Sequence, residues 1–169
     1  PYGCGVCYVR EGLIPEVRAL RVGRAVMDYF GNSYEEDESA LRYEFGVRNV
    51  ILRIGFGKTL EYFAALGMEN IHERIMRVRD YLWKGLDDIP GVHIASPRDP
   101  NLNSAVTCAV LEGKEPREVV AKAWEANIVI VPIEHVPARP DLSGVRISPT
   151  FYNNEEDIDR ILEVARGLV

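Results

Sequence analysis

The segment from residue 144 to residue 159 constrains the fold of this chain more than any other part of the sequence. Residues 145–148 are typical of a short strand, and Pro149 ends it because proline has no backbone N–H to donate. Asn153 is the expected N-cap of a following helix, and Glu156 three residues later gives the spacing of a capping box. Apolar residues then recur at helical spacing and predict a face packed on a core: Ile158, Ile161, Leu162 and Ala165.

One cation, Arg146, stands inside this otherwise apolar strand. Two interpretations are open. The guanidinium could form a structural salt bridge with a nearby carboxylate, which the residues alone favour. Alternatively, its planar fork could hold the carboxylate of a substrate through two parallel hydrogen bonds.

The chain from residue 91 onward predicts the order β-β-α-β-β-α, a small α/β sandwich with mostly antiparallel strands. Two helices are expected before it, at about 50–66 with Gly67 as the stop and at about 69–88. The expected strands of the sandwich are 92–95, 104–111, 128–133 and 145–148, and its expected helices are 116–125 and 154–168.

Residues 1–69 have a different pattern, of helix and loop with a single predicted strand at 6–10. No partner strand for it is evident, and the chain opens on a loop, so we expect part of the fold to lie upstream. The acidic run 35–38 is expected to be a solvated loop.

Composition excludes several classes of protein. The 169 residues are 47% hydrophobic and 27% charged, which is typical of a globular chain. A formal net charge of -6 argues against nucleic-acid binding, and no apolar run is long enough for a membrane span. Three cysteines cannot all pair within the chain, so we expect a reducing, cytoplasmic location.

Two motifs suggest chemistry that their context does not support. Gly55–Thr59 resembles part of a phosphate-binding loop, but the required earlier glycine is Leu52, and the region is predicted to be helical. Cys4 and Cys7 have metal-ligand spacing, yet the other candidate ligands are scattered singly, so we predict no metal site. Of the histidines, only His135, in a proline-rich loop before the Arg146 strand, stays a candidate site residue.

Three stretches, in this order, resemble the pyridoxal-phosphate (PLP) enzymes of the class V aminotransferase family: 1–10, 44–67 and 146–159. Within that family they are most similar to the branch of isopenicillin N epimerase-like and selenocysteine lyase/cysteine desulfurase-like enzymes. The resemblance implies fold type I. It makes 1–69 a remnant of the large PLP-binding domain, 70–89 a connecting helix and 90–169 the small C-terminal domain.

The resemblance also assigns roles to particular residues. Arg146 matches the arginine that binds the substrate carboxylate. Gly46 and Val47 match a Gly-Thr pair that contacts the PLP phosphate of the neighbouring subunit, although valine lacks the threonine hydroxyl. Thr150 stands where the family often has histidine, and residues 131–145 lack the nucleophilic cysteine of desulfurases, which counts against persulfide chemistry.

The sequence therefore predicts the C-terminal portion of a PLP enzyme acting on an amino acid, with epimerase or lyase chemistry among the open reactions. The Schiff-base lysine is expected upstream of Pro1, so the chain alone is expected to bind no PLP and to be inactive. The expected partner is a second copy or a chain that supplies the N-terminal large domain. The alternative is a non-catalytic α/β binding or interaction module, or one half of a split enzyme.

Overall fold

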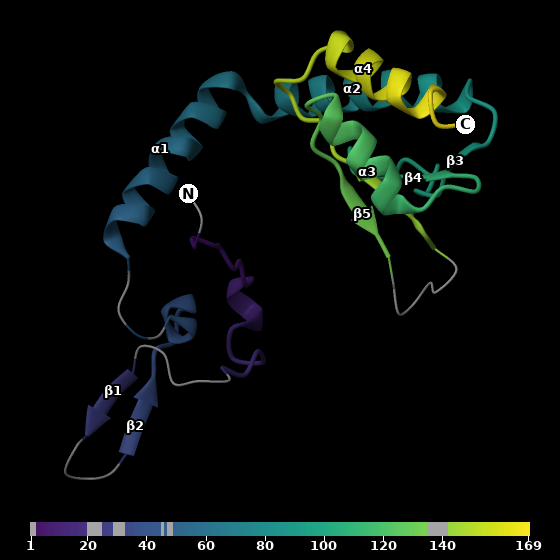
Figure 1. The fold of residues 1–169 in the computed structure, drawn as a ribbon. Helices are drawn as coiled ribbons and strands as arrows, with labels where there is room; N and C mark the ends of the chain where they lie inside the picture. The colour runs from purple at the N-terminus through teal and green to yellow at the C-terminus, as the bar shows by residue number, and fades with distance from the viewer. Residues whose placement is uncertain (1–2, 20–24, 29–32, 45, 47–48, 135–141) are drawn as a thin grey trace. The chain divides into compact units, whose positions relative to one another are not determined.

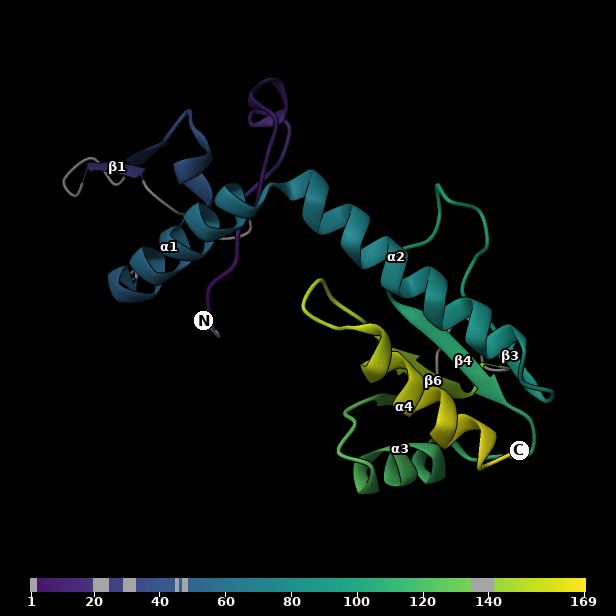
Figure 2. The same ribbon diagram turned by 90° about the horizontal axis from the view of Figure 1, so that it is seen from above.

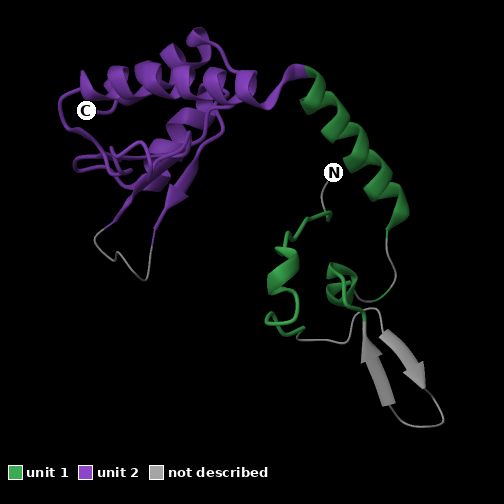
Figure 3. Cartoon of the chain, turned by 180° about the vertical axis from the view of Figure 1, so that it is seen from behind, with its two compact units in different colours: residues 1–65 green, residues 66–169 purple. Residues whose placement is uncertain are grey.

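A computed structural model describes residues 3–19, 25–28, 33–44, 46, 49–134 and 142–169. The chain divides into two compact units, residues 1–65 and 66–169, which are coloured separately in Figure 3. No helix in these described ranges is both long and apolar enough to cross a membrane.

The first unit contains short elements and one long helix. They are the 3-10 turns η1 (Glu11–Leu13) and η2 (Ala40–Tyr43), strands β1 (Ala25–Asp28) and β2 (Ser33–Glu36), and helix α1 (Val50–Leu66). Strands β1 and β2 pair antiparallel, with Ala25 opposite Glu36 and Asp28 opposite Ser33.

Two predictions for the first unit are wrong. Residues 6–10 form no strand, because no described segment pairs with their backbone, and an extended segment without a partner is not a strand. The acidic run was expected to be a loop, yet Glu35 and Glu36 lie in β2. The cross-strand ladder with β1 outweighs the low strand propensity of these acidic residues.

Helix α1 matches the prediction at both ends, and Gly67 follows it with a φ of 83°, a backbone conformation that glycine adopts without strain. None of its residues is buried, although most are apolar. Ile51 is 82% exposed and Ile54 is 63% exposed, for example. A helix that is apolar around its whole circumference is normally buried in the assembled protein.

The second unit is an α/β sandwich with one sheet. Its elements are α2 (Met68–Asp87), β3 (Val92–Ile94), β4 (Thr107–Leu111), α3 (Pro116–Glu125), β5 (Val131–Ile133), β6 (Gly144–Ile147) and α4 (Glu155–Arg166). The strand order is β3-β4-β6-β5, and every neighbouring pair is antiparallel. The predicted element order and fold class are confirmed, although β4 and β5 each begin three residues later than expected.

One hydrophobic core holds this unit together between the helices and one face of the sheet (Figures 1 and 2). Helix α2 contributes Leu82, which is fully buried, and α4 contributes the predicted apolar stripe, including Ile161. The sheet contributes alternate residues such as Ala109 and Val145. Because successive strand residues point to opposite faces, the intervening residues lie on the face that these helices leave uncovered.

Trp83 connects α2 to the sheet. Its indole N–H donates to the Thr107 hydroxyl at 2.7 Å, and both residues are buried. The guanidinium groups of Arg79 and Arg98 lie 4.4 and 4.8 Å from the centre of the indole ring, within the range of cation–π attraction. Trp83 therefore combines apolar burial, a buried hydrogen bond and two cation contacts.

The start of α4 differs from the prediction by one residue. Asn154, not Asn153, is the N-cap, and it forms a capping box with Asp157 rather than Glu156. Asn153 is engaged in the preceding turn, where its side-chain oxygen accepts from the Thr150 N–H at 3.0 Å. Its amide group donates to the Asp157 carboxylate at 3.1 Å, which fixes the turn against the helix.

This cap makes the stability of the second unit depend on pH. The pKa of Asp157 lies below its ordinary value of 3.8, first because the Asn153 side chain donates to the carboxylate and then because the Asn154 N–H does. The ionised form is thus favoured by folding, and its contribution is present above pH 3.8 and lost as the pH falls through the lower folded-state pKa. We expect Asp157→Asn to show a smaller acid-induced loss of stability, measured by urea unfolding at pH 6 and pH 3.

Glu163→Gln is the matched control, since Glu163 is exposed on the same helix. If Asp157→Asn lost as much stability on acidification as the unaltered protein, the capping interaction would not be the cause.

Candidate substrate-binding site

Arg146 is presented by β6 on the face of the sheet that the helices leave uncovered. Its neighbours in sequence, Val145 and Ile147, are 2% and 7% exposed and point into the core, whereas the Arg146 side chain is exposed. Within the described ranges, the guanidinium of Arg146 forms no hydrogen bond and no ion pair. The structure therefore shows no salt bridge to a described residue, and the guanidinium can receive an external anion.

The surroundings of Arg146 on this face are small and apolar. Its cross-strand partners are Cys108 on β4 and Val131 on β5. Gly144, two residues earlier on the same face, allows β6 to approach β4 closely, because a side chain there would meet the carbonyl oxygen of Ala109. Arg146 is the only charged residue of β4 and β6, so a carboxylate bound there would meet no competing negative charge from either strand.

The other predicted site residues lie in the other unit, outside the described residues, or in the turn before α4. Gly46 belongs to the first unit, where its φ of 73° is a left-handed conformation suited to glycine. Val47 and His135 lie outside the described residues. The suggested roles of Gly46 and Val47 at a phosphate thus stay predictions. Thr150 is half-buried in the turn before α4.

The four lysines of the chain, all of them described, lie in helices or just before one. Lys58, Lys114 and Lys122 form ion pairs with Glu61, Glu118 and Glu125 of their own helices or helix ends. The bond to Glu125 raises the pKa of Lys122, which favours the protonated form that cannot attack a carbonyl. Lys84 is exposed on α2, and no lysine lines the cavity of about 770 Å³ in the first unit or that of about 300 Å³ in the second.

The structure shows where the other two sequence motifs lie, residues 55–59 and the pair Cys4 and Cys7. Residues 55–59 lie inside α1, so they form no phosphate-binding loop. No cluster of three metal-ligating side chains exists among the described residues. Cys4 and Cys7 instead line a cavity of about 770 Å³ in the first unit, together with parts of 39–44 and 49–57.

A second cavity, of about 300 Å³, lies in the second unit. We call it the helix-side cavity, because Ile147 of β6 faces it from the core side of the sheet, opposite Arg146. No sequence pattern predicted either cavity. Their linings come from segments far apart in the chain, and only the fold brings these segments together.

Comparisons with known proteins identify the family. The family model described as Aminotransferase class-V matches residues 1–161. "Probable cysteine desulfurase 1" of Mycobacterium leprae is 31% identical over 99% of this chain and 28% of its own length. A cysteine desulfurase structure from Thermococcus onnurineus has a TM-score of 0.82 at 24% identity, covering 96% of this chain and 42% of its own.

A third similar protein, C-DES, has a structure in which glycine is covalently linked to its PLP cofactor. Its TM-score is 0.75 at 21% identity, over 94% of this chain and 41% of that one. The chain thus spans less than half the length of these proteins, and its sheet and helices have the fold of the corresponding part of PLP enzymes. The motifs at 1–10, 44–67 and 146–159 all lie within the matched residues, and the chain belongs to the aminotransferase class-V family.

Proposed function

We propose that this chain forms the C-terminal portion of a PLP-dependent enzyme that acts on an amino acid, and that Arg146 binds the substrate carboxylate. The observation that carries the proposal is the exposed guanidinium on the uncovered face of an otherwise buried strand. Membership of the family supports it, because class V relatives include cysteine desulfurases. The lysine that attaches PLP has to come from residues outside this chain.

The role of Arg146 is to orient the substrate. A planar guanidinium that donates two parallel hydrogen bonds fixes both the position and the plane of a carboxylate. Bound PLP supplies the electron sink for the reaction. Holding the carboxylate fixes which bond at the substrate α-carbon faces that sink, and the short strand β6 keeps the arginine in place.

The names of the relatives make cysteine and related sulfur-containing amino acids the first substrates to test. Residues 131–145 contain no cysteine, so no thiol in that segment can accept the substrate sulfur. We therefore favour cleavage in which sulfur leaves as part of a small-molecule product over transfer to a protein cysteine in this loop. Epimerisation is the runner-up reaction.

The test is Arg146→Ala in the PLP-loaded protein that carries this chain. We expect kcat/KM for the amino acid to fall by about 100-fold or more, because a desolvated charge-paired contact is lost. Arg146→Lys should retain only part of the kcat/KM of the unaltered protein, since lysine cannot make the bidentate contact. The amide of the same amino acid, which has no carboxylate, should be turned over about equally by all three proteins.

Arg77→Ala, which removes an exposed arginine from α2, is the control and should leave kcat/KM unchanged. An equal loss with the amino acid and its amide would show that Arg146 does not bind the carboxylate.

A second candidate function is a binding module, or one half of an enzyme assembled from two chains. Helix α1 favours it, because none of its apolar residues is buried and a further polypeptide surface would cover them. Mass spectrometry of the purified protein, with the DNA sequence immediately upstream of Pro1, separates this candidate from a single longer enzyme. An in-frame lysine codon a few positions upstream would favour the longer enzyme.

A further inference from the structure

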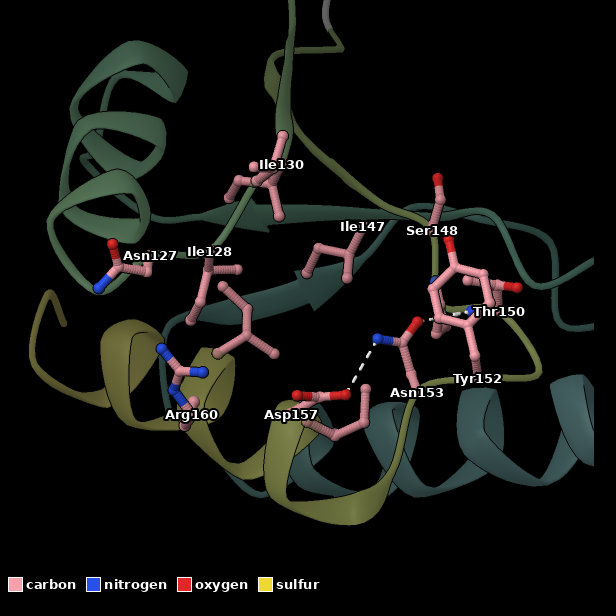
Figure 4. Close-up of a pocket in the computed structure, with 14 residues that line it drawn as sticks. Asn127, Ile128, Ile130, Ile147, Ser148, Thr150, Tyr152, Asn153, Asp157 and Arg160 are labelled. Carbon is pink, nitrogen blue, oxygen red and sulfur yellow. Dashed lines mark hydrogen bonds between the residues drawn. The ribbon is translucent and has the colours of Figure 1, made fainter. Parts of the chain in front are cut away.

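The helix-side cavity has an apolar floor and a polar edge (Figure 4). Beyond the last β5–β6 pair, Val131 with Arg146, the adjoining segments 127–130 and 147–150 both line it. Its floor is formed by buried isoleucines, with Ile147 at 7% and Ile161 at 4% exposure. A volume of about 300 Å³ matches the lower end of small-molecule sites.

Two charged side chains of opposite sign reach this cavity from α4, as Figure 4 shows for Asp157 and Arg160. They do not form an ion pair with each other within the part of the chain that the structure describes. The Asp157 carboxylate is held by Asn153 and Asn154, so its position is fixed.

Arg160 forms no ion pair with Glu156 or Glu163, both described residues of its own helix. Glu156 and Glu163 lie four residues before it and three after it, at spacings that allow ion pairs. Its guanidinium instead donates to the carbonyl oxygen of Ala126, at the end of α3. One N–H is used there, and others can donate to a ligand in the cavity. The cavity thus presents a fixed anion, a cation and an aliphatic surface side by side.

We infer that the helix-side cavity binds a free aliphatic α-amino acid, with its carboxylate on Arg160 and its ammonium group on Asp157. The branched side chain would lie on the isoleucine floor. This site is separate from the proposed substrate site, because Ile147 and Arg146 are adjacent in β6 and point to opposite faces. It is therefore a second amino-acid site on the small domain.

The experiment titrates the full chain with L-leucine while recording backbone amide NMR shifts. We expect saturable shifts at residues 127–130 and 157–161 with a Kd on the order of 1 mM, as the small size of the ligand implies. Leucinamide lacks the carboxylate, 4-methylpentanoate lacks the ammonium group and glycine lacks the side chain. Each should bind at least about tenfold more weakly.

Variants locate the site. Arg160→Gln should weaken L-leucine binding by about tenfold or more, and Arg166→Gln, a change in the last turn of the same helix, should not. Ile128→Phe fills the cavity without changing any charge and should also abolish binding, which keeps the test decisive if Arg160→Gln is poorly folded. Arg146→Ala should leave binding unchanged.

Four results would each overturn the inference. They are the absence of shifts near α4, equal binding of leucine and leucinamide, unaltered binding in Ile128→Phe, and loss of binding in Arg146→Ala. The last would place the ligand on the opposite face, at the proposed substrate site.

Discussion

Replacing Trp83 by alanine is expected to lower the free energy of unfolding of the second unit by about 3–5 kcal/mol. The side chain is 7% exposed, so its removal leaves a large cavity between α2 and the sheet. It also leaves the buried Thr107 hydroxyl without its indole donor and removes the ring that the guanidinium groups of Arg79 and Arg98 contact. Urea unfolding followed by far-ultraviolet circular dichroism measures the loss.

The chain contains its own control for this substitution. Trp124, the other tryptophan, is 67% exposed on α3, and Trp124→Ala should change the free energy of unfolding by no more than about 0.5 kcal/mol. Trp83→Phe keeps an aromatic ring near the two arginines but loses the hydrogen bond, so its loss of unfolding free energy should lie between those of Trp83→Ala and Trp124→Ala. Equal effects of Trp83→Ala and Trp124→Ala would contradict the role assigned to Trp83.

Gly144→Ala is expected to destabilise the same unit by about 1–3 kcal/mol, although it adds a single methyl group. That carbon would stand 2.5 Å from the Ala109 carbonyl oxygen and 3.1 Å from a Val110 methyl group. The carbonyl belongs to β4, which pairs with strands on both sides and cannot move aside alone. The melting temperature should fall by roughly 4–8 °C for each kcal/mol lost.

Gly167→Ala is the comparison for this change. Gly167 has an ordinary negative φ, and an added methyl carbon would meet its nearest neighbour at 3.5 Å, a normal contact. It should leave the melting temperature nearly unchanged or raise it slightly, since alanine restricts the unfolded chain. If Gly144→Ala behaved in the same way, the close approach of β4 and β6 would not constrain this position.

Sequence patterns predicted the helices of this chain best, because their signals are local. The bounds of α3 and α1 match the expected ones, since Pro116 marks the start of α3 and Gly67 the end of α1. The N-cap of α4 was misplaced because adjacent asparagines, Asn153 and Asn154, are both good caps. Only the preceding turn, which engages Asn153, decides between them.

Strand pairing was harder to predict, because a strand exists only with its partner. The β1–β2 hairpin had no clear signal, and residues 6–10 looked like a strand that finds no pair in the described structure. The role of Arg146 in the candidate site was hard to predict for the same reason, because it depends on how the strands pair. The sequence around Arg146 is compatible with either a structural salt bridge or an anion site. Only the assembled sheet shows that its side chain is exposed on the uncovered face.

The alternation along β6 has a consequence for how such a domain can evolve. Val145 and Ile147 face the core, and Gly144 and Arg146 face the opposite side, within a strand of four residues. Selection for folding therefore acts most strongly on one set of positions. Under the function proposed above, selection for ligand preference acts on residues such as Arg146 that lie between them. A lineage could exchange the residues around Arg146 and acquire a new reaction while inheriting the same core.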